Sequence, residues 1–418
     1  MREDTVNTPP DIESAELVQI APLPRVSIQA FCETPDVAQA VEQAASDRRM
    51  EKAHLRVQMG GAPAAVEAYR NAATPNVIII ETDGGRDVLI DCLDRLSEVC
   101  DVGTKVIVVG RVNDVLLYRE LMRRGVSEYL VAPVPALEVV RSLSELFRAP
   151  DADPVGRTIA FVGAKGGAGS STIAHNVAWT IARAFEQPTV VADLDLAFGT
   201  AGLDFNQDPP QGIADAVFAP DRLDSNLVDR LLTKCTQHLS LLAAPATLDR
   251  TYDFQADAFD GLYDILRSNL PYTVLDVPHG WTAWSRRALV AADEIVIVAS
   301  PDLANLRNAK NMLDLLRQQR PHDASPRLVL NQVGVPKRPE IKTTEFAKAL
   351  DIEPSAAIAF EPQLFGTASN NGQMISEISA SHKVNEVFLE IARQVTGRSE
   401  TRARKRALFD LSRLRKRA

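Results

Sequence analysis

Short apolar runs alternate with amphipathic stretches of helical length along most of the chain. In the first third, apolar runs predict strands at residues 25–30, 77–81, 105–110 and 128–131. Between them, segments such as 36–46 and 115–124 repeat their apolar residues with the spacing of a helix that buries one face. Strands and helices that alternate with short connections predict a parallel sheet covered by helices on both faces.

A second series of the same kind follows the segment 149–156, which is acidic and contains Pro150 and Pro154. This segment is the expected linker between two domains. Continuous apolar runs then predict strands at 158–162, 189–192, 239–243, 272–277, 294–299 and 327–330, and a last helix at 384–395. Such runs suit strands buried on both faces.

The expected fold class is therefore α/β, with two doubly wound parallel-sheet domains. The first domain is expected to span residues 24–148 and the second residues 157–396. Residues 1–23 are polar and include Pro9 and Pro10, which predicts a disordered N-terminus. Residues 397–418 form a basic C-terminal tail.

Composition mainly bears on the compartment. The chain has 418 residues, with 45% hydrophobic and 24% charged residues, enough for two ordinary cores. Its net charge of −9 gives no overall case for nucleic-acid binding. Four cysteines lack the spacing of a metal site or a CxxC motif, which favours free thiols in a reducing compartment. No signal-peptide pattern or long apolar run occurs, so we expect a cytoplasmic protein.

The most informative residues follow the predicted strand 158–162. A glycine-rich run leads from there into a predicted helix at 173–185. Glycines let the backbone turn so that its N–H groups converge, and the helix N-terminus adds partial positive charge. The pattern favours a phosphate-binding loop over an ordinary tight turn. The residues expected to bind the cofactor are Gly166, Gly167, Ala168, Gly169, Ser170, Ser171 and Thr172.

This loop differs from the usual P-loop in the position of its lysine. Ser170 stands where a lysine normally follows the last glycine and reaches the β- and γ-phosphates. A charge-assisted hydrogen bond contributes about 1.5–3 kcal/mol, so its loss should weaken phosphate binding. Another lysine, Lys165, occurs earlier in the loop.

Polar residues also follow three other predicted strands. Asp193 and Asp195 come at the end of one strand, two residues apart, and are expected to point the same way at the carboxyl edge, where open α/β sheets bind ligands. Asp276 lies near the end of the run 272–277, and Asn331 follows the run 327–330. Each could be an ordinary turn residue, but four motifs in this order favour one shared site.

Together these motifs resemble the MinD/ParA superfamily of deviant-Walker P-loop proteins, whose signature is the early lysine. The resemblance implies that Lys165 reaches across a dimer to the partner's nucleotide and that Asp195 orients the attacking water. These two are the expected catalytic residues. The resemblance further implies ATP as the cofactor, with Asn331 recognising adenine, and Mg²⁺ held by Ser171, Asp193 and Asp276.

The first domain narrows the resemblance to the CpaE/TadZ pilus-assembly proteins, which help to place type IV (Flp/Tad) pilus machinery at a cell pole. Residues 24–148 resemble a degenerate response-regulator receiver, which implies a flavodoxin-type fold for the first domain beside the P-loop NTPase fold that the MinD/ParA resemblance implies for the second. Glu81 stands at the position of the phospho-accepting Asp, Gly110 at that of the Thr/Ser, and Ala132 at that of the Lys before Pro133. We therefore expect a docking or dimerisation module without phosphorylation, although Glu81 could act as a permanent acidic mimic.

The segment 402–418 is strongly basic, and Leu408, Phe409, Leu411 and Leu414 could form an apolar stripe on a helix. Such a segment suits an anionic membrane surface, where each basic residue contributes about 1 kcal/mol. The MinD resemblance also implies a C-terminal membrane-targeting helix. A solvated tail is the alternative. DNA phosphates would attract the same charges, but no recognition motif accompanies the tail, so DNA binding is not expected.

These features predict a homodimer that binds ATP and Mg²⁺, hydrolyses ATP weakly and localises pilus-assembly and pole-localisation proteins. It is expected in the cytoplasm or peripherally at the inner membrane or cell pole. Two alternatives stay open: a non-enzymatic polar scaffold, and a MinD-like division-site or ParA-like DNA-partition ATPase. The acids Asp193, Asp195 and Asp276 speak against the scaffold, and the missing P-loop lysine against the second alternative.

Overall fold

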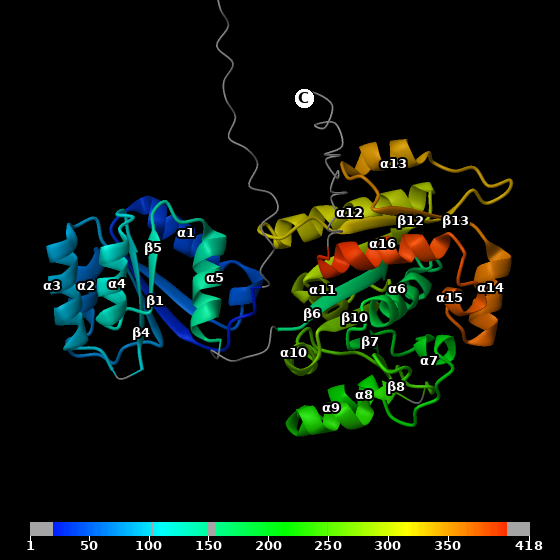
Figure 1. The fold of residues 1–418 in the computed structure, drawn as a ribbon, viewed down its shortest axis with the longest axis horizontal. Helices are drawn as coiled ribbons and strands as arrows, with labels where there is room; N and C mark the ends of the chain where they lie inside the picture. The colour runs from blue at the N-terminus through cyan, green and yellow to red at the C-terminus, as the bar shows by residue number, and fades with distance from the viewer. Residues whose placement is uncertain (1–19, 102, 149–154, 249, 399–418) are drawn as a thin grey trace, which may run out of the picture.

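The computed structural model describes residues 20–101, 103–148, 155–248 and 250–398. They form two α/β units, each built around its own sheet (Figure 1). The first sheet has five parallel strands in the order β2-β1-β3-β4-β5, and the second has eight in the order β13-β12-β11-β6-β10-β7-β9-β8. Within this described part only the short β8–β9 pair is antiparallel. The predicted α/β fold class with two parallel sheets is confirmed.

The first domain places two helices on one face of its sheet and three on the other. Helices α1 (Pro35–Ala45) and α5 (Ala136–Leu146) pack together over one face, and α2 (Gly61–Ala68), α3 (Arg86–Ser97) and α4 (Val115–Arg123) cover the opposite face. The strands between them are β1 (Ser27–Cys32), β2 (His54–Met59), β3 (Val77–Glu81), β4 (Lys105–Gly110) and β5 (Glu128–Val131), and the 3₁₀ turn η1 (Arg48–Met50) follows α1.

The second domain begins with β6 (Arg157–Gly163), which lies at the centre of its sheet between β10 (Tyr272–Val277) and β11 (Glu294–Ala299). The remaining strands are β7 (Thr189–Asp193), β8 (Thr233–Lys234), β9 (Leu239–Leu242), β12 (Arg327–Val333) and β13 (Ala356–Ala359). The helices are α6 (Ser170–Ala184), α7 (Ala201–Asp204), α8 (Ile213–Val217), α9 (Ser225–Leu231), α10 (Asp260–Asn269), α11 (Ala283–Ala291), α12 (Leu303–Gln319), α13 (Thr343–Leu350), α14 (Pro362–Asn371), α15 (Ile375–Ile378) and α16 (Val384–Thr396), with the 3₁₀ turn η2 (Pro220–Arg222).

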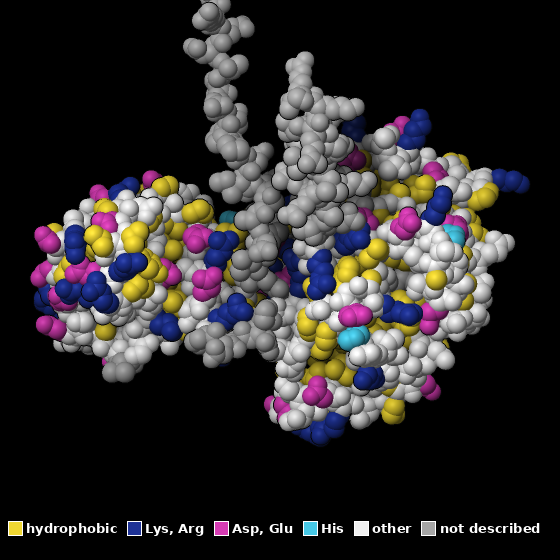
Figure 2. All heavy atoms as spheres, in the orientation of Figure 1, with side chains coloured by type: hydrophobic (Ala, Val, Ile, Leu, Met, Phe, Trp, Pro, Cys, Tyr) yellow, Lys and Arg dark blue, Asp and Glu magenta, His cyan; other side chains and the backbone are white. Residues whose placement is uncertain are grey.

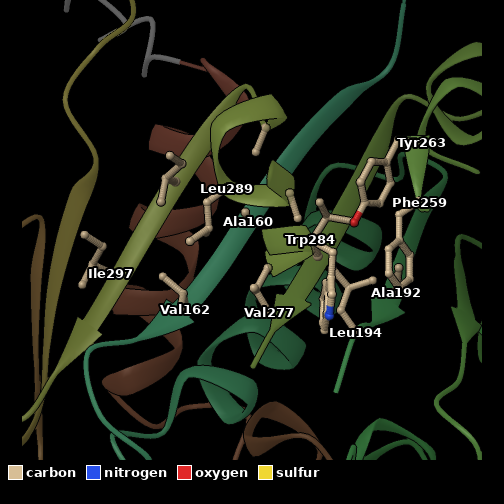
Figure 3. Close-up of a cluster of buried hydrophobic side chains, with 14 of the residues drawn as sticks. Ala160, Val162, Ala192, Leu194, Phe259, Tyr263, Val277, Trp284, Leu289 and Ile297 are labelled. Carbon is tan, nitrogen blue, oxygen red and sulfur yellow. The ribbon is translucent and has the colours of Figure 1, made fainter. Parts of the chain in front are cut away.

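Successive residues of β6 point into two different cores, as the pleat of a strand requires. Ala160 and Val162 enter the cluster beneath α10, α11 and α12, which Figure 3 shows with Trp284 and Phe259 close together. The alternate residues of β6 enter the cluster beneath α6 and α16. Because both faces are buried, β6 reads as a continuous apolar run, and the loop that follows it opens at the middle of the sheet's carboxyl edge.

The observed elements depart from the predicted ones at the sheet edges. The first strand runs from Ser27 to Cys32, two residues later than predicted, and β12 extends to Val333. The edge strand β2 was not predicted, because its sequence HLRVQM is largely exposed and lacks an apolar run. The short strands β8 and β13 were also not predicted; each pairs with only one neighbour.

Some predictions fall outside the described residues. They concern residues 1–19 of the N-terminus, residues 149–154 of the linker and the basic tail 402–418.

On the face shown in Figure 2, basic and acidic side chains are interspersed over both domains. None of the described helices combines the length and apolar character needed to cross a bilayer.

Glu81, the last residue of β3, is buried and serves as a cap for α1. Its carboxylate accepts hydrogen bonds from the Glu33 N–H at 2.7 Å, the Thr34 N–H at 2.8 Å and the Thr34 hydroxyl at 2.6 Å. Thr34 is the residue before the first turn of α1, where a carboxylate also balances the helix dipole. Burial and the carboxylate of Glu81 raise the pKa of Cys32 to about 12. These contacts favour a structural role for Glu81 over that of an exposed acidic mimic.

We expect Glu81→Ala to lower the free energy of unfolding by about 2–3 kcal/mol, because three donors at the start of α1 lose a charged acceptor. Urea denaturation of the full chain measures this loss. Asp83→Ala is the matched control, since its side chain is 60% exposed and pairs only with the exposed Arg111; its effect should stay within about 0.5 kcal/mol. Equal losses in the two variants would contradict the capping role.

Candidate nucleotide-binding site

The glycine-rich loop, residues 164–169, connects the end of β6 to the start of α6. The Ala164 N–H donates to the Val298 carbonyl at 2.8 Å, and the Ala168 N–H donates to the Lys165 carbonyl at 3.1 Å. Gly167 and Gly169 have φ angles of +82° and +86°. Glycine adopts this left-handed region without the steric cost that other residues meet, so the path of the loop requires glycine at both positions.

The loop leaves hydrogen-bond donors free at the start of α6. The first hydrogen bond of the helix runs from the Ile173 N–H to the Gly169 carbonyl. The N–H groups of residues 170–172 come before it and take no part in the hydrogen bonds of the helix. They have no acceptor among the described residues, and Gly169 at the N-cap offers no side chain. The hydroxyls of Ser170, Ser171 and Thr172 are partly exposed beside them. A helix N-terminus with unpaired N–H groups is a site that suits a phosphate.

Lys165 is exposed on this loop and forms no ion pair with any described residue. Gly166 lies beside His279, whose imidazole a side chain at position 166 would approach at 3.1 Å. A pocket of about 420 Å³ opens next to the loop, lined in part by His279, Trp281 and Asn308. The loop therefore presents its early lysine to solvent instead of burying it against its own domain.

Asn331 and Gln332, on β12, brace the loop from one side. The Asn331 amide nitrogen donates to the Ala168 carbonyl at 2.9 Å, and the Gln332 amide nitrogen donates to the Gly167 carbonyl at 2.9 Å. Asn331 is buried. The sequence resemblance predicts that Asn331 recognises adenine. Its contact with the phosphate loop was not predicted. One of the two N–H donors of its amide is thus engaged in holding the loop.

Asp193 and Asp276 lie opposite each other on the paired strands β7 and β10, at the same edge as the loop. Asp193 is fully buried and accepts hydrogen bonds from the N–H groups of Asp195 and Ala201, both at 3.1 Å. Burial and the neighbouring Asp276 raise the pKa of Asp193 to about 7. Gly199 packs so closely on this carboxylate that any side chain there would overlap it.

The sequence pattern predicts that Asp195 points the same way as Asp193 from one strand. In the structure, Asp195 lies beyond the end of that strand. Strand β7 ends at Asp193, because the Asp193 carboxylate accepts the Asp195 N–H and turns the chain. Asp195 lies in the following turn, where its own carboxylate accepts the Phe198 N–H at 3.1 Å. It is half-buried and so remains accessible to water at this edge.

His175, on α6, is a buried polar residue of the site that the sequence reasoning missed. Its Nδ1 lies 2.8 Å from the Asp204 carboxylate, and its Nε2 lies 3.3 Å from the Asp276 carboxylate. Burial lowers the pKa of His175, but the two carboxylates more than offset this and raise it to about 10. The one signal in the sequence was a polar residue on the otherwise apolar buried face of α6.

The structure thus brings Ser171, Asp193 and Asp276 to one edge of the sheet. No three His, Cys, Asp or Glu side chains of the described ranges are grouped so as to hold a metal ion by themselves. A metal at this edge would depend on the Ser171 hydroxyl, one or two carboxylates, phosphate oxygens and water, which is the ligand set that Mg²⁺ commonly uses.

Known proteins resemble this chain in sequence or in structure over part of its length. No family model matches it. MinD of Bacillus subtilis is 24% identical over 260 residues, which cover 59% of this chain and 91% of that protein. The ParA family ATPase of Chlorobium tepidum is 25% identical, covers 56% of this chain and 98% of its own, and superposes with a TM-score of 0.52.

The solved chain of the pilus assembly protein CpaE from Caulobacter crescentus is 49% identical to this one. The match covers 31% of this chain and 100% of that one, with a TM-score of 0.31. The chain belongs to the CpaE/MinD–ParA superfamily. Membership of this superfamily confirms the P-loop NTPase fold of the second sheet and makes the chain a P-loop protein of the MinD/ParA ATPase class.

Asn331 holds the glycine-rich loop, which predicts different costs for replacing the two loop glycines that have positive φ angles. Gly167→Ala should lower the free energy of unfolding by about 1–2 kcal/mol, the cost of the left-handed backbone, since a Cβ there meets open space. Gly169→Ala should cost about 1–3 kcal/mol more, because its Cβ would overlap the Asn331 amide and break the bond to Ala168.

Urea denaturation of the two variants measures the difference, and Gly167→Ala serves as the control for backbone strain alone. Equal losses would show that Asn331 does not depend on the space left by Gly169.

Proposed function

We propose that this chain is a localisation protein of the MinD/ParA class: it binds ATP with Mg²⁺, dimerises when ATP is bound, and positions pilus-assembly proteins. The observation that carries the proposal is the set of N–H groups at residues 170–172 that have no acceptor among the described residues, at the same carboxyl edge of the sheet as the buried pair Asp193 and Asp276. The 49% identity with CpaE, a pilus assembly protein, supports the pilus-related role.

The residues of this edge fit a nucleoside triphosphate and its magnesium. The N–H groups of Gly166, Gly167 and residues 169–172 would hold the phosphates, and the open space above Gly167 leaves room for them. The Ser171 hydroxyl and Asp276 would hold Mg²⁺, with Asp193 behind them. The bound magnesium would neutralise charge that develops on the phosphates during transfer.

The same edge carries features of a dimer interface. Exposed apolar side chains follow the carboxyl ends of four strands of this sheet, β7, β9, β10 and β11: Phe198, Leu248, Trp281 and Leu303, which are 74%, 64%, 47% and 73% exposed. Apolar side chains gathered around a ligand site favour contact with another protein surface. Because Lys165 is exposed on the loop at the same edge, a second copy could receive this lysine at its own nucleotide.

Hydrolysis by this site is expected to be slow. Phosphoryl transfer depends almost entirely on positioning and charge stabilisation, and Ser170 cannot supply the charge of the usual P-loop lysine. Asp195, half-buried in its turn, is the residue we assign to orient the attacking water. Lys165 of a second copy would restore part of the missing charge.

The non-enzymatic scaffold is the second candidate, and Ser170 is the observation that favours it. In that case the loop would contribute to dimerisation, with ATP structural or absent. A division-site or DNA-partition ATPase, by contrast, has no feature among the described residues that favours it over the pilus-related role.

We expect Lys165→Ala to weaken ATP binding at least tenfold in the presence of Mg²⁺, to abolish ATP-dependent dimerisation and to remove ATP turnover, because a charge-assisted bond of about 1.5–3 kcal/mol is lost. Titration calorimetry and light scattering measure the binding and the dimer. Lys310→Ala, an exposed lysine of α12 paired with Asp314, is the control and should bind ATP normally. Failure of the native chain to bind ATP would contradict the proposal and leave the scaffold.

The tail 402–418 is proposed to attach the dimer to an anionic membrane surface. Two tails in one dimer bind more tightly than one, because the second binds at a high effective concentration. Deletion of residues 402–418 should therefore remove ATP-dependent sedimentation with anionic liposomes, while neutral liposomes should bind neither protein. Unchanged sedimentation of the truncated chain would reject membrane attachment through the tail.

A further inference from the structure

A buried cluster of charged residues joins the two domains. Arg48 opens η1, just after α1 in the first domain, yet the partners of its side chain lie in the second domain. Its guanidinium donates to Asp323 at 2.7 Å and to the Ala291 carbonyl at 2.8 Å, and it lies 3.4 Å from Asp293. The side chain is only 6% exposed. A buried arginine with these partners specifies one docked arrangement of the domains.

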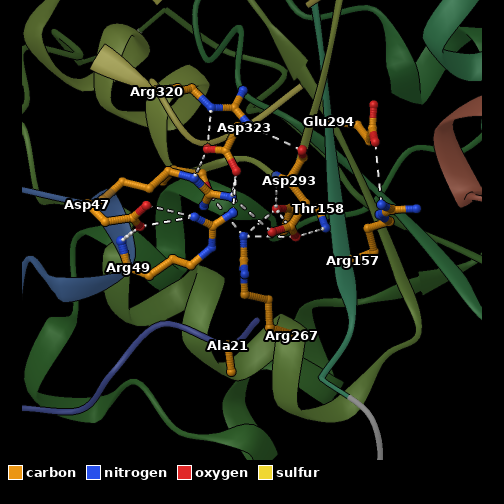
Figure 4. Close-up of polar contacts among 12 residues, drawn as sticks. Ala21, Asp47, Arg49, Arg157, Thr158, Arg267, Asp293, Glu294, Arg320 and Asp323 are labelled. Atoms are coloured by element: carbon orange, nitrogen blue, oxygen red, sulfur yellow. Dashed lines mark hydrogen bonds and ion pairs between the residues drawn. The ribbon is translucent and has the colours of Figure 1, made fainter. Parts of the chain in front are cut away.

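Arg49 links the domains through a second path. It donates to Asp47 of its own domain at 3.0 Å and also contacts Asp323. Figure 4 shows Arg49, Asp47, Asp323 and Arg320 converging from the two domains. Because Asp323 also accepts from Arg320 at 3.1 Å, one carboxylate is shared by guanidinium groups of both domains.

Asp293 extends the cluster to the central strand. Its carboxylate accepts from the N–H and the hydroxyl of Thr158, the second residue of β6, at 2.9 and 3.0 Å. Arg267 of α10 donates to the same hydroxyl and lies 3.1 Å from Asp293 (Figure 4). The cluster therefore holds the amino end of the strand whose carboxyl end carries the phosphate loop.

The two carboxylates that hold the cluster together, Asp293 and Asp323, each face more than one arginine. Burial alone would raise the pKa of Asp323 and of Asp293, but the surrounding arginines, Arg48 among them, outweigh burial and lower both pKa values below their usual range. Both carboxylates are thus ionised at neutral pH, and both are buried against arginine side chains. Removing one partner of such a group leaves an uncompensated buried charge, which is strongly destabilising.

The cluster lies at the opposite edge of the sheet from the nucleotide site. Thr158, Asp293 and Asp323 stand at or before the amino ends of β6, β11 and β12, whereas the phosphate loop follows the carboxyl end of β6. Docking at the amino edge leaves the loop, and the exposed apolar side chains around it, free to meet a second copy.

We propose that Arg48 and Arg49 fasten the first domain to the amino edge of the second, so that the two domains form one rigid body. If the proposed ATP-dependent dimer forms, which is the part of this inference that rests on the proposed function, it would hold two first domains in a fixed relative geometry. A partner with two binding sites would then engage both at once, with the gain that effective concentration provides.

The two domains carry separate natural reporters of unfolding. All three tryptophans, Trp179, Trp281 and Trp284, belong to the second domain. Cys32 of the first domain is fully buried and reacts with a thiol reagent only when that domain opens. In a urea titration of the full chain without nucleotide, we expect tryptophan fluorescence and labelling of Cys32, followed by peptide mass spectrometry, to change with one shared midpoint.

Arg48→Met should separate the two midpoints by about 1 M urea or more, because the first domain then opens on its own. Lys52→Met is the matched control: Lys52 contacts Asp264 across the same boundary, but the pair is exposed, so the midpoints should stay together. Far-UV circular dichroism before urea addition checks that each variant is folded, and Asp323→Asn repeats the test from the other domain.

Different midpoints in the native chain would overturn the proposal. A single shared midpoint in both Arg48→Met and Asp323→Asn, or loss of native dichroism in both, would also overturn it, because the cluster would then serve folding of the second domain and not the joining of two bodies. None of these outcomes depends on ATP binding, so the result is independent of the proposed function.

Discussion

The central position of β6 is the constraint on which both ends of the second domain depend. The strand is hydrogen-bonded to β10 on one side and β11 on the other and is buried by helices on both faces. Its amino end, at Thr158, enters the interdomain cluster, and its carboxyl end, at Gly163, opens the phosphate loop. A strand held on four sides cannot shift in register without moving both, so the loop is presented in one fixed position.

The charged groups at the two edges of this sheet differ in the partners that they have. At the amino edge, the carboxylates of Asp293 and Asp323 are matched by arginines and need no further partner. At the carboxyl edge, Asp193 and Asp276 share His175 as their nearby cation, and the N–H groups of residues 170–172 stay unpaired. The amino edge is therefore occupied by ion pairs among the protein's own residues, whereas the carboxyl edge combines unused donors with clustered acids, the arrangement expected where a polyphosphate and its metal bind.

The parts of the fold that could be predicted are those in which a single segment carries its own signal. Strands β3, β4, β10 and β11 are buried and read as uninterrupted apolar runs, so their predicted bounds agree with the observed ones. The glycine-rich loop can likewise be recognised from its own sequence. The edge strand β2 is largely exposed and lacks such a run. Strand β12 continues past Leu330, where its apolar run ends, through Asn331 and Gln332, whose side chains bond to the loop.

What escaped prediction depends on residues far apart in the chain. Arg48 meets Asp323 across 275 positions, and His175 meets Asp276 across the sheet, so neither pair leaves a local pattern. The position of Asp195 was mistaken for a related reason. Whether β7 continues past Asp193 is decided by the hydrogen bond between the Asp193 carboxylate and the Asp195 N–H, not by the propensity of the intervening residue.

The capping role of Glu81 and the docking of the first domain are parts of one arrangement. Glu81 holds the amino end of α1, and η1 begins three residues after α1 ends, so the orientation of this helix determines where Arg48 and Arg49 lie. A receiver that switches needs an exposed acid and a connection that can move. Here the carboxylate at the corresponding position is buried against three donors, and the far end of the same helix leads into a buried ion-pair cluster. Both ends of α1 are fixed, which suits a domain that holds a partner at a constant place relative to the nucleotide site.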